Sequence, residues 1–313
     1  MVLDIAFQQK NDTMLRIAFS SIYRYELPPD HRFPMAKYEL LSEQLIYEGT
    51  IDETAFFEPE ALTDDIILRT HTVDYLKNLQ NVSLSRKEIR AIGFPLRPEL
   101  IQRGRVIAAG TLACARIARQ EGVALNIAGG THHAFADRGE GFCIFNDIAI
   151  AANELLYQGE IQRALVVDLD VHQGNGTAKI FANDPRVFTF SMHGAKNYPL
   201  RKERSDLDVG LADGTEDQEY LSTLRAYLPD LLTAVRPDIV FYLSGVDVLE
   251  TDKLGRLGMS IAGCKARDKF VFDCCKQAGI PVAVSMGGGY SKHLAHIIEA
   301  HANTYRVASA VYH

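Results

Sequence analysis

Polar side chains at alternate positions follow an apolar run in the middle of the chain. The run Ala164–Val167 is typical of a buried parallel strand, and Asp168, Asp170 and His172 come after it. Because alternate residues of an extended chain share one face, we expect these three side chains to converge where the strand ends. Ligands of open α/β sheets bind at that end, and two carboxylates with an imidazole suit a divalent metal. The glycines of Gly174–Gly176 leave room beside it. The alternative is a polar strand end followed by an ordinary turn.

Asp247 is the best candidate for a third metal ligand from another part of the chain. It follows Ile239–Leu243, the most apolar of the strand-like runs, although an aspartate there is also a common helix cap or turn former. With Asp170 and His172 it makes a set of oxygen and nitrogen ligands. A zinc site with three protein ligands keeps one position open for water, whose pKa then falls to about 7. The pattern predicts a hydrolase with a metal-activated water.

Two adjacent histidines, His132 and His133, follow the segment Leu125–Gly130, which brings them to the same edge of the sheet. Near neutral pH, histidine can take a proton from water and return it to a leaving group. Each imidazole needs a partner on its second nitrogen, and Asp168 and Asn175 are available. A carboxylate partner holds its imidazole protonated, whereas an amide does not. The two rings therefore suit an electrostatic stabiliser and a base; the alternative is a packed or surface pair.

Three glycines precede a tyrosine in Gly287–Tyr290, directly after an apolar run. Glycine allows close backbone approach, and the Tyr290 phenol is a candidate donor to an oxyanion. The alternative is a glycine-rich turn with a packed tyrosine. A phosphate-binding loop fits less well, because no Lys-Ser/Thr pair follows.

Phe142 follows His133 by nine residues and is a candidate for the wall of a narrow channel for an alkyl chain. Cys143, beside it, is a competing candidate for a nucleophile. A reactive cysteine needs an activating base, and the metal site already supplies a nucleophile, so we interpret Cys143 as a packing residue.

Composition and charge are those of a soluble globular protein. Of 313 residues, 47% are hydrophobic and 23% are charged, and the net charge is −7. This acidic balance argues against direct nucleic-acid binding, although it allows an acidic surface that receives basic substrates. Five cysteines without a C-x-x-C pair indicate a reducing compartment. With no secretory signal and no run of membrane-spanning length, we expect a cytoplasmic protein without a membrane partner.

Strand-like runs alternate with helix-like segments, which predicts an α/β fold: a single three-layer αβα domain with a mainly parallel central sheet. Residues 1–13 are expected to be a loose extension and residues 14–313 the catalytic domain. The expected strands are Leu15–Ser20, Ala124–Ala128, Arg163–Leu169, Val187–Met192, Asp238–Leu243 and Pro281–Ser285. The expected helices are Pro98–Gln120, Asn146–Tyr157, Glu216–Val235, Ala262–Ala278 and His293–Val311. The expected irregular stretches are Tyr23–Pro34, Asn81–Pro98, Thr131–Gly141, Gly194–Gly214 and Val248–Gly258.

In combination these motifs resemble the zinc-dependent histone deacetylase family, which has the arginase/deacetylase fold. The matching segments, in the family's order and spacing, are Ala128–His133, Gly141–Cys143, Asp168–Gly176, Gly245–Asp247 and Gly287–Tyr290. The resemblance covers the chain from about Ile17 onward. It is closest to the class IV type and its bacterial relatives, by the segments His31–Met35, Gly214–Asp217 and Asp247–Gly255.

The resemblance implies a role for each matching residue. Asp170, His172 and Asp247 are expected to bind one catalytic zinc ion. His133, with Asn175, is expected to be the general base and then acid, and His132, with Asp168, to stabilise charge. Tyr290 is expected to polarise the acyl carbonyl. The residues expected to line the acyl-lysine channel are Gly141, Phe142, Gly288 and Gly289. A structural potassium ion is expected on oxygens, mainly of the backbone, from Asp168, Asp170, His172, Ser191 and Met192.

The function implied is removal of acyl, chiefly acetyl, groups from lysine side chains of proteins or peptides. Alternatives are a deacetylase of small acetylated amines such as acetylpolyamines, a long-chain deacylase, a two-metal manganese ureohydrolase and a pseudoenzyme that binds acylated peptides. The last two fit less well, because carboxylates for a second metal are absent and no predicted zinc ligand is missing. Two departures affect the rim. Class I members have a rim aspartate that has no clear counterpart in Asn81–Gly93, and no second channel phenylalanine occurs near His193–Tyr198.

Overall fold

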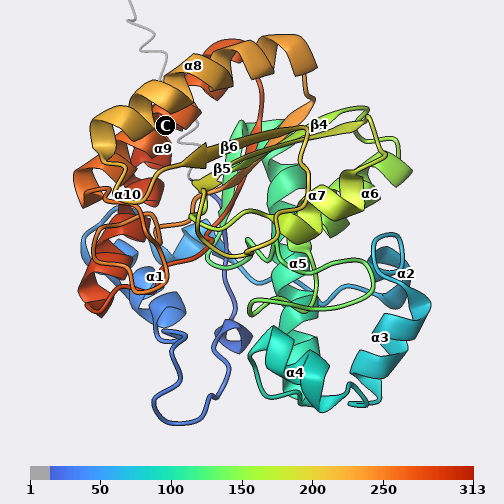
Figure 1. The fold of residues 1–313 in the computed structure, drawn as a ribbon. Helices are drawn as coiled ribbons and strands as arrows, with labels where there is room; N and C mark the ends of the chain where they lie inside the picture. Colours follow the sequence, from blue (N-terminus) through green and yellow to red (C-terminus); the bar gives the residue numbers. More distant parts are fainter. Residues whose placement is uncertain (1–14) are drawn as a thin grey trace, which may run out of the picture.

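Parallel strands form one sheet at the centre of the computed structural model, which describes residues 15–313 (Figure 1). The expected extension at residues 1–13 lies outside the described residues. The strand order is β2-β1-β3-β8-β7-β4-β5-β6, and every pairing is parallel. The strands are β1 Ile17–Ala18, β2 Phe56–Phe57, β3 Val123–Asn126, β4 Ala164–Asp168, β5 Val187–Gly194, β6 Leu207–Leu211, β7 Ile239–Leu243 and β8 Val282–Ser285.

Helices cover both faces of this sheet, which confirms the three-layer α/β prediction (Figure 1). One layer contains α1, α8, α9 and α10, which pack in sequence against one another; the other is centred on α5 and α6. The α-helices are α1 Lys37–Tyr47, α2 Asp64–Ile67, α3 Val73–Gln80, α4 Arg86–Ile92, α5 Pro98–Glu121, α6 Asp147–Tyr157, α7 Asn175–Phe181, α8 Asp217–Val235, α9 Ile261–Ala278 and α10 Leu294–Tyr312. Two short 3₁₀ helices are η1 Ser21–Tyr23 and η2 Glu53–Ala55.

The long helices begin and end where local signals place them. Pro98 stands in the first turn of α5, where a missing N–H costs nothing, and Gly122 ends it with φ of 93°. In α9, the Ser260 hydroxyl accepts a hydrogen bond from the Gly263 N–H, and Gly279 adopts φ of 68° at the other end. The expected bounds of the five long helices are therefore confirmed to within a residue or two.

Short elements were not predicted. The stretch Asn81–Pro98, expected to be irregular, contains α4, which begins with a capping box between Ser85 and Glu88. The stretch Gly194–Gly214 contains β6, an edge strand whose exposure alternates. The expected strand Leu15–Ser20 forms only over Ile17–Ala18. These segments are too short for hydrophobic periodicity to be distinctive, so their structure depends on tertiary packing.

The central strands end side by side, so their following loops meet. Asn126 and Leu243 both pair with Ser285, and Asp168 pairs with Leu243. The four loops after β3, β4, β7 and β8 carry the adjacent histidines, the acidic motif, Asp247 and the glycine-tyrosine motif. Within residues 15–313, no helix combines the length and the apolar composition that a membrane crossing requires.

Candidate active site

Three buried side chains form a cluster that could hold a metal ion. One ligand atom from each of Asp170, His172 and Asp247 lies within 4.8 Å of the others. His172 Nδ1 is 3.1 Å from Asp170 Oδ1 and 3.1 Å from Asp247 Oδ2. Ligands bound tetrahedrally at zinc distances lie about 3.3 Å apart, so the cluster has the size that such an ion requires.

Backbone groups orient the remaining carboxylate oxygens of the cluster. Gly288 N–H donates to Asp170 Oδ2 at 2.8 Å, and Val171 N–H donates to Asp247 Oδ1 at 2.9 Å. A Cβ at Gly288 would lie 2.1 Å from Asp247 Oδ2, so only glycine permits this approach. The loops after β4, β7 and β8 thus hold each carboxylate with one oxygen bonded and one directed into the cluster.

The electrostatics of the cluster require positive charge at its centre. Burial and the neighbouring Asp170 raise the pKa of Asp247 to about 7. Burial disfavours the charged form of His172, but its hydrogen bonds to Asp170 and Asp247 outweigh this and raise its pKa to about 10. Two buried carboxylates around one nitrogen are stabilised by a cation between them, and a divalent ion fits this donor set.

The acidic motif converges by turns rather than by strand alternation. β4 ends at Asp168, and the chain bends over the next residues. Asp170 N–H donates to Asp168 Oδ1 at 3.2 Å, and His172 N–H donates to Asp170 Oδ1 at 3.0 Å. Each carboxylate therefore folds back on the backbone two residues ahead, as in an Asx-turn. The prediction that these residues lie at the strand end is confirmed, but the extended-chain reason for it is wrong.

The two adjacent histidines have partners of unequal charge. His132 Nδ1 is 2.6 Å from Asp168 Oδ2, and His133 Nδ1 is 2.6 Å from Asn175 Oδ1. Burial disfavours charge on His132, but Asp168 and Asp170 outweigh it and raise its pKa to about 9. Burial, with the charges of His132 and His172, holds the pKa of His133 well below its usual value. One ring thus favours the charged form and the other the neutral form.

The Asn175 amide is held by a second carboxylate that the motifs did not indicate. Its Nδ2 donates to Glu140 Oε2 at 3.3 Å, and the Tyr198 hydroxyl donates to the same oxygen at 2.6 Å. This directs the amide oxygen toward His133, so that His133 Nδ1 is the donor and Nε2 is free to accept a proton. The Tyr198 ring packs edge-on against His133, with centroids 5.0 Å apart. Only the position of Glu140 between two glycines of the loop could have drawn attention to it.

Gly174 and Gly176 make room for the histidine loop as well as for the cluster. A Cβ at Gly174 would lie 2.3 Å from Asp168 Oδ2, and one at Gly176 would lie 2.2 Å from the Ala134 carbonyl oxygen. These glycines therefore allow the loop after β3 to lie against the loop after β4.

Asp147, at the start of α6, fixes the loop that carries the histidines. Its carboxylate accepts hydrogen bonds from Gly130 N at 3.1 Å, Thr131 N at 2.7 Å and Ser285 Oγ at 3.0 Å. Its role was not predicted, because backbone donors leave no sequence pattern.

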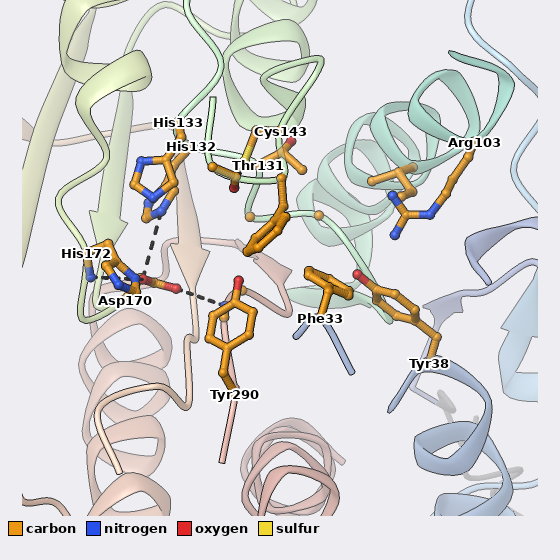
Figure 2. Close-up of a pocket in the computed structure, with 17 residues that line it drawn as sticks. Phe33, Tyr38, Arg103, Thr131, His132, His133, Cys143, Asp170, His172 and Tyr290 are labelled. Atoms are coloured by element: carbon orange, nitrogen blue, oxygen red, sulfur yellow. Dashed lines mark hydrogen bonds and ion pairs between the residues drawn. The ribbon is translucent and has the colours of Figure 1, made fainter. Parts of the chain in front are cut away.

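Tyr290 lies beside the cluster, as Figure 2 shows. Its N–H donates to Asp252 Oδ2 at 2.6 Å, and Asp252 also accepts from Leu254 N at 2.8 Å and Gly255 N at 2.9 Å. Burial, with Asp247 and Asp170 nearby, raises the pKa of the Tyr290 phenol well above its usual value. The phenol therefore stays protonated at neutral pH and can donate a hydrogen bond.

Aromatic residues flank the entrance to the cluster. The Phe142 ring centroid is 5.9 Å from that of Tyr290 and 5.2 Å from that of Phe33. Gly141 lies against His133, since a Cβ there would be 2.5 Å from His133 Cδ2. Cys143 donates through Sγ to the Gly141 carbonyl, and burial raises the pKa of its thiol, which agrees with a packing role.

Two connected spaces surround these residues. The inner one is a cavity of about 40 Å³ that Phe33, Tyr38, Arg103 and Ile107 help to line (Figure 2). The outer one is an open cleft that also reaches His133, His172 and Tyr290. Of the expected channel glycines, Gly141 lines both spaces and Gly288 the inner one. Gly289 lines neither, and its position is against Val246 and Ile297.

The geometry agrees with what the chain resembles among known proteins. A family model described as the histone deacetylase domain matches residues 31–305. The chain belongs to the histone deacetylase family. Members of this family are deacetylating hydrolases, so the cluster, the histidines and Tyr290 lie where the family's hydrolytic site is expected.

Individual members of the histone deacetylase family resemble the chain over most of its length. An uncharacterized protein of Picosynechococcus sp. is 43% identical over 296 residues, which are 95% of this chain and 99% of that protein. Histone deacetylase 2 of Arabidopsis thaliana is 32% identical over 277 residues, 86% of this chain and 72% of that one. The crystal structure of a histone deacetylase homologue from Aquifex aeolicus has a TM-score of 0.81 and 21% identity, and it covers 95% of this chain and 84% of that chain.

Proposed function

We propose that this deacetylase-family protein is a zinc-dependent amidohydrolase that removes acetyl groups from the side-chain amine of lysine in proteins or peptides. The observation that carries the proposal is the buried cluster of Asp170, His172 and Asp247 beside a neutral histidine and a protonated phenol. The donor set of two carboxylates and one imidazole is typical of a catalytic zinc site. A zinc ion held there would supply Lewis acidity toward the acyl carbonyl and toward water.

His133 is the proton carrier in this proposal. Its Nδ1–H is donated to Asn175, which leaves Nε2 to take a proton from the attacking water. The same nitrogen then protonates the departing lysine amine, which would otherwise leave as an unstable anion. An amide partner suits this role, because it orients the ring without holding the proton on it.

His132 and Tyr290 stabilise charge. The Asp168 carboxylate keeps His132 cationic, so this ring offsets negative charge that develops on the attacked carbonyl group and its nucleophile. The Tyr290 phenol donates to the carbonyl oxygen from the side of the Gly287–Gly289 turn, as one arm of an oxyanion hole. Asp252 acts through Tyr290 by holding its backbone N–H.

The inner cavity favours a short acyl group. Its volume of about 40 Å³ corresponds to roughly three water molecules. An acetyl methyl group fits such a space, whereas a long alkyl chain would require Phe33, Tyr38 or Ile107 to move. The structural potassium ion belongs to the same proposal: Ser191 of β5 pairs with Asp168 of β4, so the oxygens expected to bind it are neighbours.

The test is acetate release from an acetyl-lysine peptide with uncharged flanking residues. Metal-free protein reconstituted with one equivalent of zinc should release acetate, and the metal-free sample should not. His133→Ala, which leaves the three cluster residues intact, should bind the same amount of zinc and release acetate at a rate lower by about two to four orders of magnitude. Zinc-loaded protein that binds the peptide without releasing acetate would contradict the proposal.

A further inference from the structure

The mouth of the cleft is strongly cationic. It is the outer space that reaches His133, His172, Phe142 and Tyr290. Its permanently charged lining residues are Arg32, Arg90, Lys196 and Arg256. None of the described residues that line it is acidic. The chain as a whole has a net charge of −7, so this cationic mouth, defined by these four residues, stands against an acidic background.

Two of the four cations share one carboxylate. Lys196 Nζ lies 3.7 Å and Arg256 Nη1 lies 3.3 Å from Asp213 Oδ2. The side chains of Lys196 and Arg256 are 73% and 57% exposed. Asp213 can neutralise only one of the two charges, so this side of the mouth retains a positive charge that faces solvent.

The other two cations have no carboxylate partner within residues 15–313. The Arg32 guanidinium lies 4.9 Å above the ring of Phe142, at the wall of the channel. The Arg90 side chain donates only to the backbone oxygen of Arg86, one turn back in α4. A cation–π contact and one carbonyl bond leave most of their donors free. Both can therefore bind an anionic group that approaches the channel.

The four residues come from separate segments: the loop before α1, helix α4, the loop after β5 and the loop after β7. Their charges thus surround the entrance rather than forming a single point. The Arg256 segment is tied to the catalytic face, because Asp252 holds both Gly255 N–H and Tyr290 N–H. Such a ring suits a ligand with several anionic groups around a central acyl chain.

Resting on the proposed deacetylase function, we propose that the substrate is an acyl-lysine set in an acidic peptide segment. Arginine pairs with carboxylates through two parallel hydrogen bonds, and clustered cations raise the local concentration of anionic ligands. The same field repels polyamines, so it argues against an acetylated polyamine as the substrate. It also means that the overall acidity of the chain does not describe the surface that the substrate meets.

The experiment compares acetyl-lysine peptides that differ only in two residues on each side, as Asp, Gln or Lys. Turnover and the binding of fluorescent versions are measured on the zinc-loaded protein. At low salt we expect kcat/KM for the Asp peptide to exceed that for the Lys peptide at least about tenfold. The ratio should shrink at about 0.5 M salt, because exposed charges are screened within a few ångströms there.

Charge-neutralising variants locate the effect. Arg32→Gln combined with Arg256→Gln should lower the Asp-to-Lys ratio to a third or less of its wild-type value, in turnover and in binding alike. Arg163→Gln, an exposed position before β4 at the opposite end of that strand, should leave the ratio unchanged. Thermal unfolding of each variant shows whether it is folded.

Two further arms separate the sources of negative charge and the two proposals. If 4-acetamidobutyrate is cleaved better than the Asp peptide, a peptide substrate is wrong. N-acetylputrescine should be the poorest substrate, and turnover of it that exceeds the Asp peptide overturns the proposal. Equal binding of the Asp and Lys peptides overturns it as well. Tighter binding of the Asp peptide with no cleavage of any substrate supports the cationic mouth and contradicts the proposed deacetylase activity instead.

Discussion

The floor and the mouth of the cleft have opposite charge and opposite exposure. The floor contains the carboxylates of Asp170 and Asp247, both buried, around the single nitrogen of His172. The mouth contains four cations, and those at Lys196 and Arg256 face solvent. Buried charges interact strongly and are little affected by salt, whereas exposed ones are screened. The floor therefore governs whether the reaction occurs, and the mouth governs which substrate reaches it.

The largest effect should follow from removing one floor carboxylate. Asp247→Asn keeps the shape but removes an anionic ligand, so zinc content should fall and kcat/KM should drop at least about a thousandfold, since metal assistance contributes several kcal/mol. Zinc is measured on the same sample. Asp273→Asn, at an exposed aspartate of α9, is the matched control and should keep both. Full activity without zinc in Asp247→Asn would refute the role of the floor.

Tyr290→Phe should come next in size. The ring can keep its contact with Phe142, and the backbone bond to Asp252 is unaffected, so zinc content and stability should be unchanged. Loss of one oxyanion donor costs about 10²–10³ in kcat. Single-turnover kinetics and zinc analysis check this prediction. A variant with wild-type kcat would remove the phenol from the account of the floor.

Sequence alone was sufficient for the floor and insufficient for the mouth, for a physical reason. Asp168, Asp170, His172 and Asp247 directly follow strongly apolar strands, and parallel strands bring their ends together. Arg32, Arg90, Lys196 and Arg256 belong to loops and a short helix, whose meeting depends on tertiary packing.

The same limit applies to residues that position the floor. Asp147 and Asp252 act on backbone N–H groups, which every sequence has, so no motif could indicate them. The charge of the whole chain was also a poor guide, because it allowed an acidic entrance where the structure has a cationic one.

Exchanging the charge of a histidine partner should change the pH profile. Asn175→Asp places a carboxylate on His133 and favours its protonated form, so its pKa rises. Because the base must be neutral, the acid limb of kcat/KM should move to higher pH by about one unit or more. The limb is measured with the neutral peptide between acidic and neutral pH. An unmoved or downward-shifted limb would mean that His133 is not the titrating base.

The smallest effect should come from Glu140, which acts on His133 only through Asn175. Glu140→Ala removes the acceptor that orients the Asn175 amide, and a single hydrogen bond corresponds to about a two- to tenfold loss in kcat. Glu140→Gln keeps an acceptor oxygen and should restore most of the rate. Nitrogen NMR of the His133 ring checks the tautomer. Equal rates and an unchanged tautomer in Glu140→Ala would limit Glu140 to the rim.

Anomalous X-ray scattering at the zinc edge, from crystals of zinc-loaded and active protein, tests the central claim most directly. The account predicts one strong peak among Asp170, His172 and Asp247, and its disappearance in crystals of Asp247→Asn grown in the same way. A peak at another place in the active protein, or an undiminished peak in the variant, would contradict it.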